Sequence, residues 1–256
     1  AVAGLAANGA DAAGQSCRIV HAAEMSMGSD EVGGVVVPMD ISGQTVHLLV
    51  DTGGVLSMLT KSTVDKLGLP NSAMAPGRYF SMFGGQKIDH FSTAYDVDLG
   101  GLKIKTMRFA IMPDGQMPPG VDGTISPDIL SVYDAEFDFA NNKFYLNLQD
   151  HCPGMVVYWT SSPYAIIPMW TGSDGHVSVT ANLDGKQIPA IVDTGSTRSY
   201  MSLDAAQSEF SLTEKDANLK REGSAENGYS YRYPFKMLAL DGINISHPDL
   251  ILVPDS

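Results

Sequence analysis

The first half of the chain alternates short apolar runs with turn-forming residues, a pattern typical of consecutive β-strands. Apolar runs at 35–37 and 46–50 lie on either side of residues 41–44, whose glycine and small polar side chains favour a tight turn. The second run ends at Asp51, which is followed at once by Thr and two Gly. The pattern therefore predicts a strand that delivers a carboxylate into a turn.

The rest of this half continues the β pattern and adds short helical segments. Residues 60–68 are predicted to be helical, because a Ser or Thr is available to cap the start of the helix and Gly68 can end it. Residues 79–87 have the pattern of a β-hairpin with Gly84 and Gly85 at its tip. Further segments of this half, mostly with strand character, lie at 94–99, 102–111, 121–130 and 135–148. The predicted half is mostly β.

The pattern of the first half returns in the second half, which indicates an internal repeat. With an offset of 142 positions, residues 35–51 align without a gap on residues 177–193. With an offset of 141, residues 99–104 align on residues 240–245. The sequence therefore predicts two related lobes.

Four segments are expected along the chain. Residues 1–33 are rich in Ala, Gly, Ser and Asp without periodicity, so they are expected to form a flexible N-terminal arm. The first lobe is expected at 34–150 and the second at 173–256, joined by a connector at 151–172. The second lobe ends before any counterpart of residues 121–148, so either the chain is truncated or this lobe is completed in another way.

Composition and charge exclude some classes of partner. The 256 residues carry 16 Lys and Arg against 29 Asp and Glu, a formal net charge of −13, which argues against nucleic acid or an anionic membrane as the main partner. The charge also suits an acidic working environment. No apolar run approaches the roughly 20 residues that a membrane-spanning helix needs. The N-terminal residues have the character of a mature terminus after removal of a signal, or of an artificial chain start.

The cysteines and histidines leave little room for a metal site. Cys17 and Cys152 could form a disulfide if the protein is exported, and two unpaired thiols are the alternative, since pairing cannot be read from sequence. The six histidines are scattered without the spacing of metal ligands. Neither a metal nor a cofactor is therefore expected.

One motif occurs at the equivalent place in each half. Residues 48–54 read Leu-Leu-Val-Asp-Thr-Gly-Gly, and residues 190–196 read Ala-Ile-Val-Asp-Thr-Gly-Ser. In both, an apolar strand delivers an aspartate into a tight turn, where glycine permits backbone angles that other residues avoid. The repeat predicts that Asp51 and Asp193 meet in space as a pair.

Two carboxylates at hydrogen-bonding distance have a definite chemistry. They cannot both ionise cheaply, because like charges repel strongly in a partly dry site, so the pair shares one proton. The ionised member can take a proton from a water molecule, while the protonated member donates to the carbonyl that the water attacks. This is the logic of aspartic proteases, the standard example of such a dyad.

The two Asp-Thr-Gly motifs, each after an apolar strand, resemble those of aspartic peptidases of the pepsin and retropepsin type. Residues 121–130, Val-Asp-Gly-Thr-Ile-Ser-Pro-Asp-Ile-Leu, followed by the strand pattern of 133–139, look similar to the bacterial retropepsin-like branch. In that branch an Asp-Gly-Ile-Leu-Gly segment precedes a Leu-Asp-Phe strand. The resemblance covers residues 33–256 and implies a mostly β, bilobal acid-protease-like fold, with two related β-barrel-like lobes, short helices and flap hairpins.

The resemblance also implies roles for individual residues. Asp51 and Asp193 would be the catalytic dyad, Thr52 and Thr194 would hydrogen-bond across the lobe interface, and the glycines would let the backbone turn beneath the carboxylates. The residues implied in support of the active-site loops are Thr52, Gly53, Gly54, Thr194, Gly195 and Ser196. The residues implied in two substrate-binding flaps are Tyr79, Phe80, Phe83, Gly84, Gly85, Tyr229 and Tyr231, although the alternating tyrosines could instead cover one face of a sheet.

Two positions depart from the family pattern. Gly54 stands where the family usually has Ser, Thr or Ala, and Ser126 stands where it usually has Gly. Together with the short second lobe, they motivate an alternative to catalysis, a peptide-binding module on a protease scaffold that has lost activity. An inactive fragment or precursor is a third hypothesis.

The first hypothesis is an exported bacterial aspartic endopeptidase, periplasmic or secreted, that cleaves an extended peptide or unfolded protein held between its lobes. A monomer suffices for the dyad, since one chain carries both halves. A dimer is expected only if the second lobe needs a partner to complete it.

Overall fold

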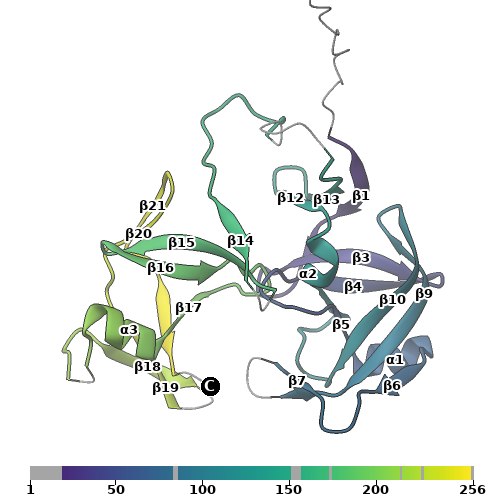
Figure 1. The fold of residues 1–256 in the computed structure, drawn as a ribbon, viewed down its shortest axis with the longest axis horizontal. Helices are drawn as coiled ribbons and strands as arrows, with labels where there is room; N and C mark the ends of the chain where they lie inside the picture. The colour runs from purple at the N-terminus through teal and green to yellow at the C-terminus, as the bar shows by residue number, and fades with distance from the viewer. Residues whose placement is uncertain are drawn as a thin grey trace, which may run out of the picture.

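The computed structural model describes residues 19–82, 86–150, 157–172, 175–213, 215–225 and 228–254 of the chain. Figure 1 shows two groups of strands side by side, with the first part of the chain in purple and teal and the second part in green and yellow. The fold is mostly β, with three short helices in the described residues. The expected fold class, mostly β with two lobes, is confirmed.

The first lobe is one long sheet that closes on itself. Its strand order is β2-β3-β4-β11-β5-β10-β9-β6, and β3 pairs with β9 as well as with β4, which turns the sheet into a barrel. The strands of this sheet are β2 (Gly28–Ser29), β3 (Val35–Ile41), β4 (Gln44–Val50), β5 (Met58–Thr60), β6 (Asn71–Ala73), β9 (His90–Leu99), β10 (Leu102–Met112) and β11 (Gly123–Ile125).

Burial in this lobe follows the strand period, and the strand that leads into the first Asp-Thr-Gly motif ends in a buried run. Along β4, Val46, Leu48 and Val50 are buried, while Thr45 and His47 are exposed. The buried side chains pack with those of β9 and β10 in a single core. The motif therefore begins at the end of a strand that the core holds in place.

The short strand β11 joins the two strands that flank this motif. It pairs in parallel with β4 and antiparallel with β5, so that it lies between them. A Cβ on Gly123 would come within 2.0 Å of the Met58 carbonyl oxygen, so the strand can enter this position only with glycine there. Close approach of the two backbones therefore explains the glycine of the 121–130 segment.

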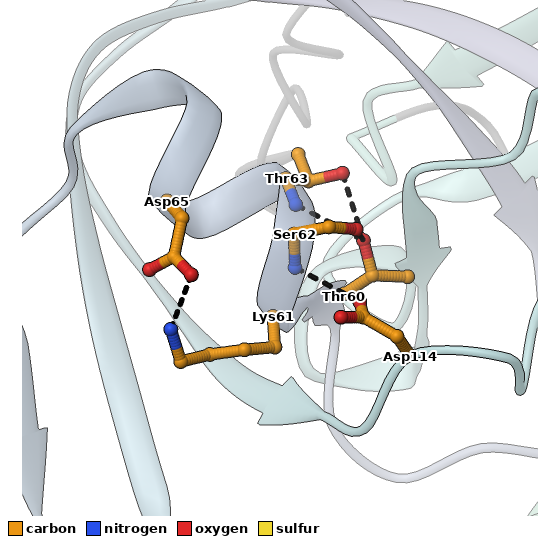
Figure 2. Close-up of polar contacts among 6 residues, drawn as sticks. All are labelled: Thr60, Lys61, Ser62, Thr63, Asp65 and Asp114. Carbon is orange, nitrogen blue, oxygen red and sulfur yellow. Dashed lines mark hydrogen bonds and ion pairs between the residues drawn. The ribbon is translucent and has the colours of Figure 1, made fainter.

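Helix α1 (Lys61–Leu67) follows β5 and confirms the helix expected at 60–68. Figure 2 shows its capped start: Thr60 Oγ1 accepts a hydrogen bond from the Thr63 amide at 3.2 Å, and the Ser62 amide donates to Asp114 at 2.9 Å. Gly68 ends the helix in the left-handed region, with φ 63°. An ion pair between Lys61 and Asp65 lies along its exposed side.

The expectation of a flexible arm over residues 1–33 is wrong for its last part. Strand β1 (His21–Ser26) pairs antiparallel with β13 (Lys143–Asn147), which also pairs with β12 (Asp134–Asp138). Ala23 and Met25 of β1 are buried in the core of the first lobe. Their alternation with exposed neighbours is a strand signal, which the surrounding Ala, Gly and Ser obscured.

The second lobe consists of two smaller sheets and helix α3 (Leu203–Phe210). One sheet has the order β14-β15-β20-β21 with β16 also paired to β15, and the other has the order β17-β22-β19-β18. Their strands are β14 (Met169–Thr171), β15 (Val177–Leu183), β16 (Lys186–Ile191), β17 (Ser199–Ser202), β18 (Lys220–Ala225), β19 (Gly228–Arg232), β20 (Met237–Leu240), β21 (Ile243–Ser246) and β22 (Leu250–Val253). Because β14 pairs with β15, the end of the segment expected as a connector at 151–172 is part of this lobe.

The strand pairings of the two lobes correspond. The parallel pair β5–β10 matches Met58 with Ala110, and the parallel pair β17–β22 matches Tyr200 with Ile251 at the equivalent positions. In the described residues of the second lobe, however, no strand lies between β16 and β17 as β11 lies between β4 and β5. As a result Ile191 is 52% exposed, whereas Leu49 of β4 is 6% exposed.

Among the described residues, no helix is long and apolar enough to cross a membrane.

Strand β1 should contribute measurably to the stability of the first lobe. Replacing Met25 with Ala should lower the free energy of unfolding by about 2–4 kcal/mol, because it removes a buried side chain and leaves a cavity. The same change at the exposed neighbour Ser26 should have little effect. Chemical denaturation of both variants measures the difference, and equal stabilities would mean that β1 does not pack as described.

Candidate active site

The structure brings Asp51 and Asp193 together. A Cβ on Gly53 would lie 2.2 Å from Cγ of Asp193, and a Cβ on Gly195 would lie 2.5 Å from Oδ1 of Asp51. Each glycine thus lies against the carboxylate of the other loop. The loops that follow β4 and β16 therefore meet with their two carboxyl groups side by side.

The glycines of the two motifs are required for space rather than for backbone angle. Neither Gly53 nor Gly195 has a positive φ, so the expectation that they permit an unusual turn is wrong. Any side chain at Gly53 would collide with Asp193, and any side chain at Gly195 would collide with Asp51. The close approach of the two loops depends on both glycines.

Two threonines fasten the loops to each other through four hydrogen bonds. The Thr52 hydroxyl donates to the Val192 carbonyl oxygen at 2.6 Å, and the Thr194 hydroxyl donates to the Val50 carbonyl oxygen at 2.7 Å. In return, the Thr194 amide donates to Thr52 Oγ1 at 3.0 Å, and the Thr52 amide donates to Thr194 Oγ1 at 3.2 Å. The arrangement is symmetric between the lobes, as the repeat in the sequence predicts.

Backbone amides orient each carboxylate within its own loop. Oδ1 of Asp51 accepts from the amides of Gly53 at 3.1 Å and Gly54 at 2.8 Å, and Oδ1 of Asp193 accepts from the Gly195 amide at 2.8 Å. The Asp51 amide itself donates to the Ile125 carbonyl oxygen of β11 at 2.9 Å. The first carboxylate is thereby tied to the barrel.

Burial and the neighbouring carboxylate raise the pKa of Asp51 to about 6. The larger cause is the loss of solvent around the charged form, and the charge of Asp193 adds to it. The amides of Gly54 and Gly53 favour the charged form and oppose the shift. Asp51 therefore keeps its proton at pH values at which an ordinary aspartate is ionised.

A buried polar cluster supports the first loop from below. The Ser57 amide and hydroxyl both donate to Oδ1 of Asp128, at 3.0 and 2.7 Å, and the Ser126 amide donates to the Ser57 hydroxyl at 3.0 Å. Burial raises the pKa of Asp128, and the hydrogen bonds from Ser57 oppose that rise. Ser57 and Asp128 were not among the residues expected at the site.

A sequence signal for this cluster existed. Asp128 follows Ser126-Pro127, a combination that favours the start of a helix, and α2 (Pro127–Leu130) does begin there. What the sequence did not indicate is that the aspartate points back to Ser57 rather than to solvent.

The second loop lacks such support in the described residues. Ser196 donates to the Arg198 carbonyl oxygen at 2.8 Å within its own turn, and among the described residues it makes no hydrogen bond to Asp193. Asp193 is exposed to solvent, whereas Asp51 is half-buried. The pair is therefore asymmetric in its surroundings although symmetric in its backbone.

The residues expected in the first flap lie on a short hairpin. Strands β7 (Phe80–Ser81) and β8 (Lys87–Ile88) are paired, and Tyr79 and Phe80 are exposed on it. The Lys87 ammonium lies 4.4 Å from the centre of the Tyr79 ring. Phe83, Gly84 and Gly85, expected at the tip, lie outside the described residues.

The expected second flap corresponds to the hairpin of β18 and β19. Tyr229 is exposed, and the Arg221 guanidinium lies 2.9 Å from the centre of its ring. Tyr231 instead packs against the core of the second lobe, so that it covers one face of a sheet. In Figure 1 this hairpin and β7 both lie at the lower edge of the molecule, one from each lobe.

The cysteine prediction falls on Cys17 and Cys152, which both lie outside the described residues. Within the described ranges, no three His, Cys, Asp or Glu side chains are grouped so that they could hold a metal ion.

Comparison with known proteins agrees with the resemblance inferred from the motifs. Residues 37–124, which include the first Asp-Thr-Gly motif and reach into β11, match the sequence profile of the family described as aspartyl protease. The first lobe carries the aspartyl protease pattern. No curated protein sequence matches the chain significantly.

Solved structures similar to this chain include two retropepsin-like proteins. One is a retropepsin-like aspartic protease from Rickettsia conorii, with 17% identity and a TM-score of 0.35, covering 52% of this chain and 94% of that one. The other is the retroviral protease-like domain of Ddi1 from Leishmania major, with 22% identity and a TM-score of 0.32, covering 44% and 90%.

The threonine hydrogen bonds should hold the two lobes together. Replacing Thr52 with Val keeps the shape of the side chain but removes its hydroxyl, so the Val192 carbonyl and the Thr194 amide lose a partner. We expect the free energy of unfolding to fall by about 1–3 kcal/mol. The control is Thr45→Val on the exposed face of β4, which should change stability little. Thermal unfolding measures both, and equal midpoints would contradict the role of Thr52.

The raised pKa of Asp51 should appear as a pH-dependent stability. The folded state binds this proton more tightly than the unfolded state, so the associated stability is complete below about pH 3.8 and is lost as the pH rises through about 6. Asp51→Asn cannot titrate and lacks this contribution. We therefore expect the wild type to lose stability relative to Asp51→Asn between these pH values, as measured by thermal unfolding. A constant difference across the range would contradict the shift.

Proposed function

We propose that the protein is an aspartic endopeptidase whose dyad is Asp51 and Asp193, one residue from each lobe. The observation that carries this proposal is the contact of the two carboxyl groups across a symmetric set of threonine hydrogen bonds. The match of the first lobe to the aspartyl protease family supports it. The reaction would be the hydrolysis of a peptide bond by a water molecule without a covalent intermediate.

The asymmetry of the dyad suggests a division of roles. The proton that the pair shares would reside on Asp51, because burial favours the neutral form there. Asp51 would then donate to the carbonyl oxygen of the substrate, while the ionised Asp193 would take a proton from the attacking water. In the breakdown of the tetrahedral intermediate, Asp193 would give its proton to the leaving nitrogen while Asp51 takes a proton from one of the two hydroxyls, so the carboxylic acid and the amine form as the C–N bond breaks and the pair returns to its starting state.

The substrate would be an extended peptide. The hairpins of β7–β8 and β18–β19 carry exposed aromatic side chains, Tyr79, Phe80 and Tyr229, that could close over such a peptide from both lobes. Strand-like pairing with the hairpin backbone would give affinity with little dependence on sequence. One chain contains both aspartates, so a monomer would be sufficient for the reaction.

A second candidate function is peptide binding without cleavage. The observation that favours it is the unsupported second loop: Asp193 is exposed, and the described residues place no strand between β16 and β17 beneath it. A loop held less firmly would position its carboxylate less well, and a displacement of about 1 Å can cost roughly a hundredfold in rate. Binding through the hairpins would survive such a loss.

Substitution of each aspartate distinguishes the two candidates. Asp51→Asn and Asp193→Asn should each reduce cleavage of an unfolded protein substrate to background, because either change removes one of the two proton-transfer groups. Asp241→Asn, at an exposed site, should cleave as the wild type does. Wild-type cleavage should be inhibited by a statine-type compound and should decline as the pH rises through about 6, where Asp51 loses its proton.

The outcomes separate the candidates clearly. Cleavage that persists in both aspartate variants would exclude the dyad. A wild type that binds the statine compound or a peptide but cleaves nothing between pH 3 and 7 would favour the binding module.

A further inference from the structure

The space beside Gly54 is already filled. A Cβ on Gly54 would lie 2.7 Å from Oδ2 of Asp51 and 2.7 Å from Oγ of Ser126, closer than real Cβ atoms approach their neighbours. Gly54 does not have a positive φ, so the backbone does not demand a glycine there. Residue 54 is restricted to glycine by the two groups that surround it, the Asp51 carboxylate and the Ser126 hydroxyl.

The internal repeat provides a comparison for this position. The residue equivalent to Gly54 in the second loop is Ser196, so one loop carries a hydroxyl at this point and the other does not. In the first lobe, the hydroxyl of Ser126 occupies the space next to the missing side chain. Ser126 belongs to the segment after β11, for which the second lobe has no counterpart in the described residues.

Ser126 is held rigidly and its hydroxyl is not used for helix capping. The side chain is fully buried, its amide donates to the Ser57 hydroxyl at 3.0 Å, and its carbonyl oxygen accepts from the amides of Ile129 at 2.9 Å and Leu130 at 3.0 Å. Ser126 stands at the N-cap of α2, where a serine hydroxyl usually bonds to the helix backbone, but it makes no such bond. The hydroxyl is instead directed at the side chain of Thr124.

The hydrogen bond that the Ser126 hydroxyl makes is a weak one. The hydroxyl donates to Thr124 Oγ1 at 3.5 Å, which is at the outer limit for a hydrogen bond. Oδ2 of Asp51 borders the same space from the other side, also 2.7 Å from the Cβ position of residue 54, and a carboxylate oxygen is a stronger acceptor than a hydroxyl. Oδ1 of the same carboxylate is already engaged by the amides of Gly53 and Gly54.

We propose that Gly54 and Ser126 are a compensated pair, in which Ser126 is a positioning residue that supplies, beside Oδ2 of Asp51, the hydroxyl that residue 54 does not carry. Its catalytic consequence rests on the proposed function, whereas its packing and its effect on Asp51 can be measured without any substrate. The pair keeps the first carboxylate both enclosed and oriented although Gly54 contributes no side chain.

The first test is an exchange of the two residues. Gly54→Ser alone should lower the unfolding temperature by several degrees, because the new side chain collides with both the Ser126 hydroxyl and the Asp51 carboxylate. Ser126→Gly alone should also destabilise, since it leaves an empty space beside Asp51. The double variant should be more stable than the sum of the two losses predicts, because the new serine at 54 fills that space.

Matched controls separate this coupling from the general cost of each change. Gly28→Ser adds the same group at a strand position where a Cβ would meet its nearest neighbour at 3.7 Å, an ordinary contact, so it should be tolerated. Ser72→Ala, on the exposed strand β6, controls for the loss of a serine hydroxyl. Losses that simply add in the double variant would overturn the pairing.

The second test isolates the hydroxyl from the packing. Ser126→Ala keeps most of the volume but removes the hydroxyl, so the charged form of Asp51 loses a nearby polar group that can stabilise it, and the pKa of Asp51 should rise above the wild-type value. The titratable group that faces Asp51 from the other lobe is Asp193, and Asp128 of α2 is engaged by Ser57, so both should be followed in the same measurement. Carbon-13 NMR of labelled aspartate carboxyl groups reports each of them.

The readouts keep this proposal apart from the proposed function. An unchanged Asp51 titration in Ser126→Ala would overturn the positioning role, whatever the activity. If the coupling and the pKa change are both found while the wild type cleaves nothing, the pair stands and the endopeptidase proposal fails. If the wild type is active, Ser126→Ala should shift the high-pH limb of kcat/KM upward, and Gly54→Ser/Ser126→Gly should return it toward the wild-type position.

Discussion

The contact between the two Asp-Thr-Gly loops is the interaction on which the arrangement of the lobes at this site depends. Each threonine hydroxyl donates to a backbone carbonyl of the other loop and accepts from the other threonine's amide, so neither loop can move without breaking bonds in both directions. The glycines permit this approach, because the opposite carboxylate occupies the space where a side chain would be. Two carboxyl groups are thereby held side by side, and because two carboxylate charges would repel each other there, the arrangement favours a single proton shared by the pair.

The two loops are built alike but are supported differently. In the first lobe, the carbonyl oxygen of Ile125 in β11 accepts a hydrogen bond from the Asp51 amide. The chain after β11 then forms the cluster of Ser57, Ser126 and Asp128, which supports the loop from below. In the described part of the second lobe, the loop of Asp193 follows a strand paired on one side only. Burial is therefore concentrated on Asp51, and the raised pKa of that residue is a direct result of this difference.

Gly54 and Ser126 illustrate why departures from a family pattern must be read in three dimensions. Taken one at a time, a missing hydroxyl near the first aspartate and an added hydroxyl beneath it both suggest a damaged site. The structure places the two positions on either side of the same point, where the Ser126 hydroxyl occupies the space that a side chain at 54 would need. Two departures that count separately against catalysis in the sequence are therefore neighbours in the fold, and their effects have to be judged together.

The sequence by itself determined the elements, the repeat and the pair of motifs. Strand period, capping residues and glycine stops are local properties, so β3, β4, α1 and the β9–β10 hairpin could be predicted closely. The offset between Asp51 and Asp193 indicated that they are equivalent, and equivalence in a two-lobed fold implied that they meet. The signal for β1 was missed because small residues masked its alternation.

Only the tertiary structure decided which residues support the site and why the glycines are there. The partnership of Ser57 with Asp128 joins positions that are 71 apart in the chain, and no local pattern in either segment records it. Gly53 and Gly195 are required by a carboxylate that arrives from the other lobe, a constraint that does not exist until the chain has folded. Local propensities act between neighbours in sequence, whereas exclusion of volume and satisfaction of buried polar groups act between neighbours in space.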